Sequence, residues 1–230
     1  MSLFLAILFA LIPPAAGSAA SPGPSASPHE LKTIVTVKSS PYCNALAEHF
    51  NNALVPMVAN DRVFDVVNVQ LEDMNVMFNY PDYQSRFLDL RAKIVKESAT
   101  LDQSLRPIHD QINALRDSAS LSTDPQAAKQ MRDAAAQLQD AYLHQFQLST
   151  DLTKLAEFMM DYNIMRGRHP LNGWTPYENT VPADEQNMKI VLHFDQQRQT
   201  IGWGEDKAVD IATTAAETHC SSTASPSPKP

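Results

Sequence analysis

Two long stretches of the chain repeat apolar residues every seven positions, at about residues 82–118 and 125–166. In each stretch two columns, offset by three or four positions, lie on one face of a helix. The shared period predicts a long antiparallel helical hairpin with coiled-coil-like packing. The columns are Phe87, Ile94, Leu101, Ile108, Leu115 with Ser98, Leu105, Ile112, Ala119, and Met131, Leu138, Leu152, Met159 with Ala134, Ala141, Leu148, Leu155, Tyr162.

Gln145 is the one polar residue in the columns of the second stretch. A glutamine at such a position is either an exposed break in the apolar stripe or a buried residue that fixes the register of the helices. We interpret Gln145 as an exposed break.

Residues 117–125 separate the two stretches and carry no apolar period. Thr123 or Asp124 is expected to cap the second helix, with Pro125 in its first turn, and Thr123 with Gln126 forms a capping-box pattern. Pro107 lies inside the first stretch, where the apolar repeat continues past it. We therefore expect a kink near residues 103–107.

The composition supports an all-α fold class. The chain has 230 residues, of which 43% are hydrophobic, and no glycine occurs between Gly23 and Gly167. Hairpin-rich β folds need residues at positive φ, so this glycine-free run favours long helices. Gly167 itself suits the end of the second long helix.

Shorter segments precede the hairpin. Residues 31–37 are rich in β-branched side chains, which favours a short extended segment. Its one β-like partner in the sequence is the run 188–194, which also fits a helix. Pro41 begins a helix, Pro56 is expected to kink or end it, and Asp61 opens a further helical segment.

After the hairpin, Pro182 begins a helix, Gly202–Gly204 is expected to interrupt it, and a last amphipathic helix runs to Cys220. The pattern as a whole predicts a bundle of about five helices built on the long hairpin.

The N-terminus is typical of an export signal. Leu3–Ile12 is an apolar run too short to span a bilayer, and Gly17–Ala20 supplies small residues for cleavage. The alternative is a buried element of the mature fold. We predict a signal peptide at 1–20, a disordered Pro/Ser linker at 21–29, a single helical domain at 30–220 and a disordered Ser/Pro tail at 221–230, in a secreted or periplasmic protein.

Two cysteines, Cys43 and Cys220, lie near the two ends of the predicted domain. Export permits a disulfide, and a bridge between them would close nearly the whole domain. The alternative is a reactive thiol at Cys43, near the start of a helix. We predict the disulfide, which the chain-entropy model values on the order of 5 kcal/mol.

The charge of the chain bounds its partners. A formal net charge of −8 argues against nucleic acid or anionic lipid as the main partner. The seven histidines include no pair at a spacing of three or four residues, and no phosphate loop or nucleophile elbow occurs. The sequence therefore predicts no catalytic residue, no metal site and no cofactor. Three methionines, Met159, Met160 and Met165, are typical of core filling rather than of a soft-metal site.

Residues 166–178 form the one chemically dense stretch. Arginine forks suit carboxylate or phosphate groups, and exposed aromatic rings stack on sugars or other rings. The alternative is a loop that folds over the end of the bundle and is anchored by its tryptophan. The candidate ligand-binding residues are Arg166, Arg168, His169, Trp174 and Tyr177.

Two functions follow as hypotheses. The first is an exported, non-enzymatic interaction or structural module with a protein partner that the sequence does not identify, no nucleic acid and no stable membrane insertion after signal cleavage. The second is a small-molecule or glycan-binding domain, enzymes included, that uses the 166–178 loop.

Overall fold

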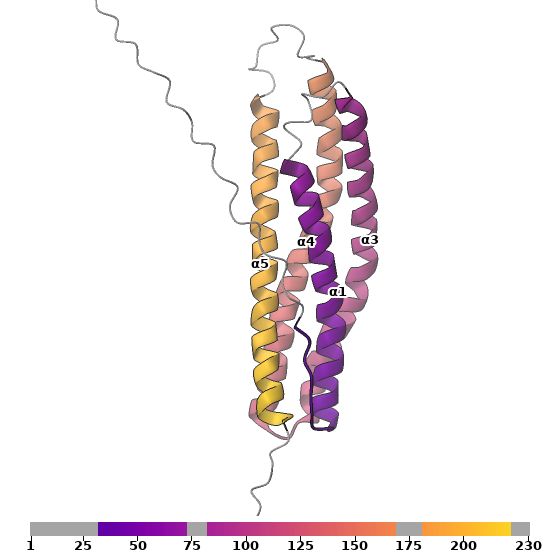
Figure 1. Ribbon diagram of the computed structural model, residues 1–230. Coiled ribbons are helices and arrows are strands. Elements are labelled where there is room, and N and C mark those ends of the chain that lie inside the picture. The colour runs from indigo at the N-terminus through magenta and orange to yellow at the C-terminus, as the bar shows by residue number, and fades with distance from the viewer. Residues whose placement is uncertain (1–31, 73–81, 169–180, 222–230) are drawn as a thin grey trace, which may run out of the picture.

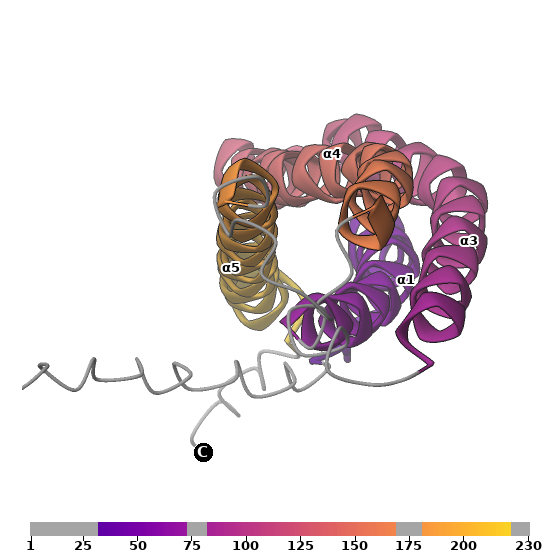
Figure 2. The same ribbon diagram turned by 90° about the horizontal axis from the view of Figure 1, so that it is seen from above.

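A computed structural model describes residues 32–72, 82–168 and 181–221 (Figure 1). Within these ranges the chain forms four long α-helices, one short 3-10 turn and no strand. Successive helices run in opposite directions, and the view from above places α3 and α5 at opposite corners of the bundle (Figure 2). The predicted all-α bundle is confirmed, with four helices in place of about five. The elements are α1 (Pro41–Glu72), α3 (Tyr83–Asp117), η1 (Ser118–Leu121), α4 (Pro125–Arg168) and α5 (Val181–His219).

The predicted hairpin is the pair α3 and α4, and its apolar columns are buried wherever their side chains are described. Asp124 caps α4, since its Oδ1 accepts the N–H of Gln126 at 2.9 Å, and Pro125 is the first helical residue. The capping residue is thus Asp124 and not Thr123. The third residue of the helix is then an alanine, whose side chain cannot accept the N–H of the capping residue, so the predicted capping box of Thr123 and Gln126 does not form.

Two local expectations about the hairpin have different outcomes. Helix α3 continues through Pro107, while the kink expected there stays a prediction. Helix α4 continues through Gly167 to Arg168, so Gly167 does not end it.

Helix α1 is continuous through Pro56, which was expected to kink or end it, and no second helix opens at Asp61. A proline inside a helix costs about 3 kcal/mol. Here Leu54 and Met57 on either side of it are almost completely buried, and burying such side chains contributes about 1.5–3 kcal/mol each. The core contacts therefore offset the proline.

Helix α5 is likewise continuous through Gly202–Gly204, which was expected to interrupt it. A Cβ placed on Gly204 would lie 3.1 Å from the Cβ of Ala141 in α4. The glycine therefore permits a close approach of α4 and α5, and contacts along the rest of α5 offset its low helix propensity.

Residues 32–40, which we call the strap, form an irregular chain that runs beside α1 (Figure 1). The predicted pairing with 188–194 is wrong, because that run lies within α5. The strap instead forms its backbone hydrogen bonds at Ile34 with the side chain of Asn51 in α1. Its Oδ1 accepts the N–H of Ile34 at 2.8 Å, and its Nδ2 donates to the carbonyl oxygen of Ile34 at 2.9 Å.

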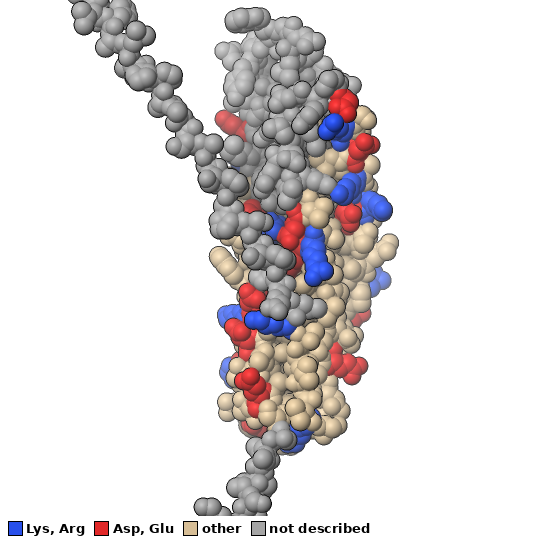
Figure 3. Space-filling model, viewed as in Figure 1, with Lys and Arg blue, Asp and Glu red and all other residues tan. Residues whose placement is uncertain are grey.

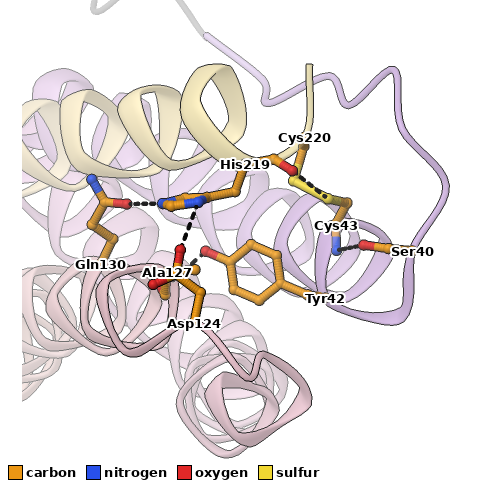
Figure 4. Close-up of a disulfide and its surroundings, with 8 residues drawn as sticks. All are labelled: Ser40, Tyr42, Cys43, Asp124, Ala127, Gln130, His219 and Cys220. Atoms are coloured by element: carbon orange, nitrogen blue, oxygen red, sulfur yellow. Dashed lines mark hydrogen bonds and ion pairs between the residues drawn. A yellow bond between two sulfur atoms is a disulfide. The ribbon is translucent and has the colours of Figure 1, made fainter. Parts of the chain in front are cut away.

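The predicted disulfide joins the start of the first helix to the end of the last one, at one end of the bundle. Cys43 in the first turn of α1 is bonded to Cys220, 177 residues later, after the end of α5 (Figure 4). Ser40 caps α1, with its Oγ accepting the N–H of Cys43 at 3.1 Å. The N–H of Lys38 donates to the carbonyl oxygen of Cys220 at 2.8 Å, so the strap is attached at the same point.

Side chains beside the disulfide connect α1, α4 and α5 (Figure 4). The hydroxyl of Tyr42 donates to the carbonyl oxygen of Ala127 at 3.0 Å, and burial together with the charge of Asp124 raises the pKa of Tyr42 to about 12. His219 Nε2 lies 2.8 Å from Oε1 of Gln130, and its Nδ1 lies 3.3 Å from Oδ2 of Asp124. This end of the bundle is thus held covalently and by polar contacts.

Candidate functional site

The sequence-predicted ligand site is only partly within the described residues. Arg166 and Arg168 belong to the last turn of α4. His169, Trp174 and Tyr177 lie outside the described residues. The 166–178 site therefore stays a prediction, and the candidate sites below come from other parts of the chain.

Gln145 is buried in the middle of the bundle, so its interpretation as an exposed break is wrong. Its Nε2 lies 2.9 Å from the carbonyl oxygen of Met57, 2.8 Å from Oδ1 of Asp61 and 3.3 Å from Oε1 of Glu205. The seven-residue repeat alone places Gln145 toward the core. The acceptors that satisfy its amide lie on α1 and α5, which the repeat of the hairpin does not describe.

Further polar groups complete a buried layer across all four helices. Asn60 Nδ2 in α1 donates to Oε1 of Gln145 at 3.3 Å, and Ser104 Oγ in α3 donates to Oδ1 of Asn60 at 2.9 Å. Buried polar groups of this kind specify which helices pack together and in which register. The polar layer consists of Asn60, Asp61, Ser104, Gln145 and Glu205.

Glu205 is an acid of this layer whose pKa is strongly shifted. Burial, followed by the charge and hydrogen bond of Asp61 and the charge of Asp206, raises the pKa of Glu205 well above its usual value. Its Oε2 is buried without a hydrogen-bond partner. Two acids that share a proton can serve acid–base chemistry only where a substrate reaches them. Gln145 and Glu205 are both shielded from solvent, which favours a structural role for the layer.

The strap carries the most exposed large apolar side chains among the described residues. Val35 is 80% exposed and Val37 is 74% exposed, whereas Ile34 is 5% exposed. This alternation has the two-residue period of a strand. The sequence singled out the β-branched residues 31–37, but not which of their side chains face outward, because β-branched residues occupy both alternating positions.

The backbone of the strap leaves one edge open. Both polar backbone groups of Ile34 bind Asn51, and neighbouring residues of an extended chain direct theirs to the opposite side. No backbone hydrogen bond joins Val35 or Val37 to another described residue. Among the described residues, the backbone groups of Val35 and Val37 therefore have no backbone partner, and both valine side chains are exposed.

A cavity of about 160 Å³ adjoins this edge, between the strap and the last turns of α5. Thr33, Val35 and Val37 line it from the strap. Ala216 and Glu217 line it from α5. A cavity of roughly 150 Å³ accommodates a benzene-sized group, so this one has room for a single side chain of that size.

Charges border the strap. Lys32 begins it and Lys38 lies two residues before its end, both are exposed, and neither forms an ion pair with another described residue. In the lower half of this face, Figure 3 shows uncharged side chains in the centre and charged ones, mostly Asp or Glu, toward the two sides.

Comparison of the chain with known protein families, curated proteins and solved structures finds no match. In the described ranges, no helix is both long and apolar enough to cross a membrane. The same ranges hold no group of three or more acidic, histidine or cysteine side chains placed to bind a metal ion.

Proposed function

We propose that this chain is an exported, non-enzymatic interaction module that binds an extended segment of another protein at the open edge of the strap. The observation that carries the proposal is that the backbone of Val35 and Val37 bonds to no other described residue, combined with the exposure of both valines. In strand addition, main-chain hydrogen bonds supply affinity and pockets for alternate side chains supply specificity. The strap offers both elements, since the cavity lies beside its open edge.

Rigid attachment of the strap supports this function. Asn51 holds the strap at Ile34, and the carbonyl oxygen of Cys220 holds it at Lys38. A binding edge that is already ordered loses less conformational entropy when a partner docks. The four-helix bundle then acts as the scaffold that presents the edge.

Export is supported by two observations of different kinds. The Cys43–Cys220 disulfide is typical of proteins in oxidising compartments. The apolar run Leu3–Ile12, followed by small residues, has the pattern of a cleaved signal.

The test selects peptides from a random library of eight to ten residues against the disulfide-bonded chain. Amide hydrogen exchange then maps the selected binders, and protection is expected at Val35 and its neighbours in the strap. Val35→Pro removes a backbone donor from the edge and should weaken binding at least tenfold. Val35→Thr keeps the N–H and the branched shape, so it serves as the matched control and should retain binding.

Both variants are first checked for an unchanged melting temperature and an intact disulfide. Equal binding to Val35→Pro and Val35→Thr, or protection confined to other elements, would overturn strand addition as the function.

A further inference from the structure

We infer that the cavity beside the strap takes a basic side chain of the partner segment, with Glu217 of α5 as the acceptor of its charged group. This inference rests on the proposed function, because it names the chemistry of one residue in the segment that binds at the strap. It is carried by the side chains that line the cavity, which are independent of the backbone argument for strand addition.

The polar lining of the cavity favours a group that donates hydrogen bonds. The polar residues that line it are Glu217, Thr33, Thr213 and Ser221, and Glu217 alone among them is charged. None of these four side chains forms a hydrogen bond or an ion pair with another described residue. An ionised carboxylate can only accept hydrogen bonds, whereas an ammonium or guanidinium group can only donate them. A basic group therefore complements this lining, while an acidic one would face a like charge.

The apolar part of the lining suits the aliphatic stem of a basic side chain. Val35 and Val37 line the cavity from the strap and are exposed, and Ala216 lines it from α5. Lysine and arginine pack their methylene groups on apolar surface while the charged group reaches a polar partner. The cavity of about 160 Å³ has room for one such side chain. A purely apolar side chain would instead leave the carboxylate of Glu217 without a partner once the segment covers the cavity.

The charges around the cavity favour one basic residue over a run of them. Lys32 and Lys38 of the strap are exposed, and neither lines the cavity. Their charges oppose a run of basic residues along the strap, although salt screens exposed charges beyond about 10 Å. A basic group inside the cavity contacts Glu217 and neither lysine. The formal net charge of −8 also favours a cationic partner in general.

The test selects the same random library against the parent chain and against Glu217→Gln, which keeps the shape of the side chain and removes its charge. Peptides selected on the parent should share one lysine or arginine at a fixed position, and those selected on Glu217→Gln should lack this preference. Norleucine, which keeps the aliphatic stem, then replaces the basic residue in the selected peptides. Their dissociation constants, measured by fluorescence anisotropy, should rise roughly fivefold on the parent and stay unchanged on Glu217→Gln.

Glu185→Gln is the matched control, because it changes the net charge equally at an exposed position near the opposite end of α5. It should behave as the parent does. Higher salt should reduce the effect of norleucine on the parent, because exposed charges are screened. Equal melting temperatures and intact disulfides are verified for all three proteins before binding is compared.

The outcomes separate the inference from the function on which it rests. If selected peptides protect the strap from hydrogen exchange but show no basic preference that depends on Glu217, strand addition stands and the inference is wrong. If that preference is present while Val35→Pro binds as well as Val35→Thr, strand addition is wrong and the cavity still takes a basic side chain. A library that yields no binder would overturn both.

Two other occupants of the cavity would give distinct results. A concentration-dependent dimer in sedimentation that Glu217→Gln abolishes would assign the cavity to a lysine of a second copy. Tighter peptide binding by Lys229→Gln would assign it to the C-terminal segment of this chain, which follows Ser221. Either result would overturn the inference that a partner protein supplies the basic residue.

Discussion

The disulfide end of the bundle and the polar layer near its middle hold the same helices together by different means. At the disulfide end, Cys43 and Cys220 join α1 to α5 covalently, and apolar residues fill the core around them. In the polar layer, Gln145 and Glu205 are buried among amides and acids from other helices. A covalent link adds stability whatever lies around it. Buried polar groups add little net stability but penalise any packing that leaves them unpaired.

The contrast predicts its largest effect at the disulfide end. Replacing both Cys43 and Cys220 by alanine should lower the free energy of unfolding by about 2–5 kcal/mol, because the open unfolded chain regains the entropy of a 177-residue loop. Urea unfolding of the variant and of the oxidised parent measures the difference. A change below about 1 kcal/mol would mean that non-covalent contacts alone hold this end.

The next effect is expected beside the polar layer, where Gly204 of α5 packs closely against Ala141 of α4. Gly204→Leu should destabilise the fold by about 1–3 kcal/mol, because its Cβ would meet the Cβ of Ala141 at 3.1 Å. Thermal and urea unfolding measure it, with Thr214→Leu on the exposed face of α5 as the control. Adding Ala141→Gly should recover part of the loss. An unaffected Gly204→Leu variant would show that the two helices can separate freely.

The polar layer should respond to pH through Glu205, in a range well below that in which Tyr42 at the disulfide end ionises. The pKa of Glu205 is raised above its usual value of 4.5, so above that pH the folded chain holds a proton that the unfolded chain has released. The contribution of Glu205 to the free energy of unfolding is therefore fully present below pH 4.5. It declines as the pH rises toward the pKa of Glu205 in the folded chain. The decline is at most about 1.4 kcal/mol per pH unit for a one-proton difference.

Glu205→Gln removes this titration while keeping the shape of the side chain. Free energies of unfolding measured between pH 5 and pH 8 should fall less steeply for the variant than for the parent. Glu217→Gln, at an exposed position on the same helix, is the control and should leave the slope unchanged. Equal slopes for parent and Glu205→Gln would show that the layer does not retain a proton.

The smallest effect is expected from Tyr42→Phe at the disulfide end. The variant loses one hydrogen bond to the carbonyl oxygen of Ala127. Its free energy of unfolding should therefore fall by about 0.5–1.5 kcal/mol. Because the pKa of Tyr42 is raised to about 12, the parent should also lose stability above pH 10, where the unfolded tyrosine ionises first. Alkaline unfolding curves of the two proteins test both statements. A variant as stable as the parent would make the hydroxyl dispensable.

Prediction from the sequence succeeded for features that depend only on residues within one helix. The bounds of the hairpin, the burial of columns such as Phe87 to Leu115, and the cap of α4 all depend on local periodicity and on residues close in the chain. The pairing of Cys43 with Cys220 was predictable for a different reason, since the chain contains only two cysteines.

It failed where a local preference is overridden by a neighbouring helix. Pro56 and Gly202–Gly204 weaken a helix locally, yet both helices continue because their flanking residues pack in the core. Gln145 appears solvent-exposed in sequence until its partners on α1 and α5 are known. The same holds for the candidate site. The β-branched composition of residues 31–37 is visible in the sequence, but which backbone groups of the strap find a partner is not.

By itself, the amino-acid order determined the helical class of this protein, its long hairpin and its one possible crosslink. These depend on side-chain period and residue type, which act over a few turns of chain. The tertiary structure alone decided which groups satisfy Gln145 and which side of the strap remains unpaired. Both depend on atoms that are 17 to 88 positions away in sequence and meet only when the helices pack.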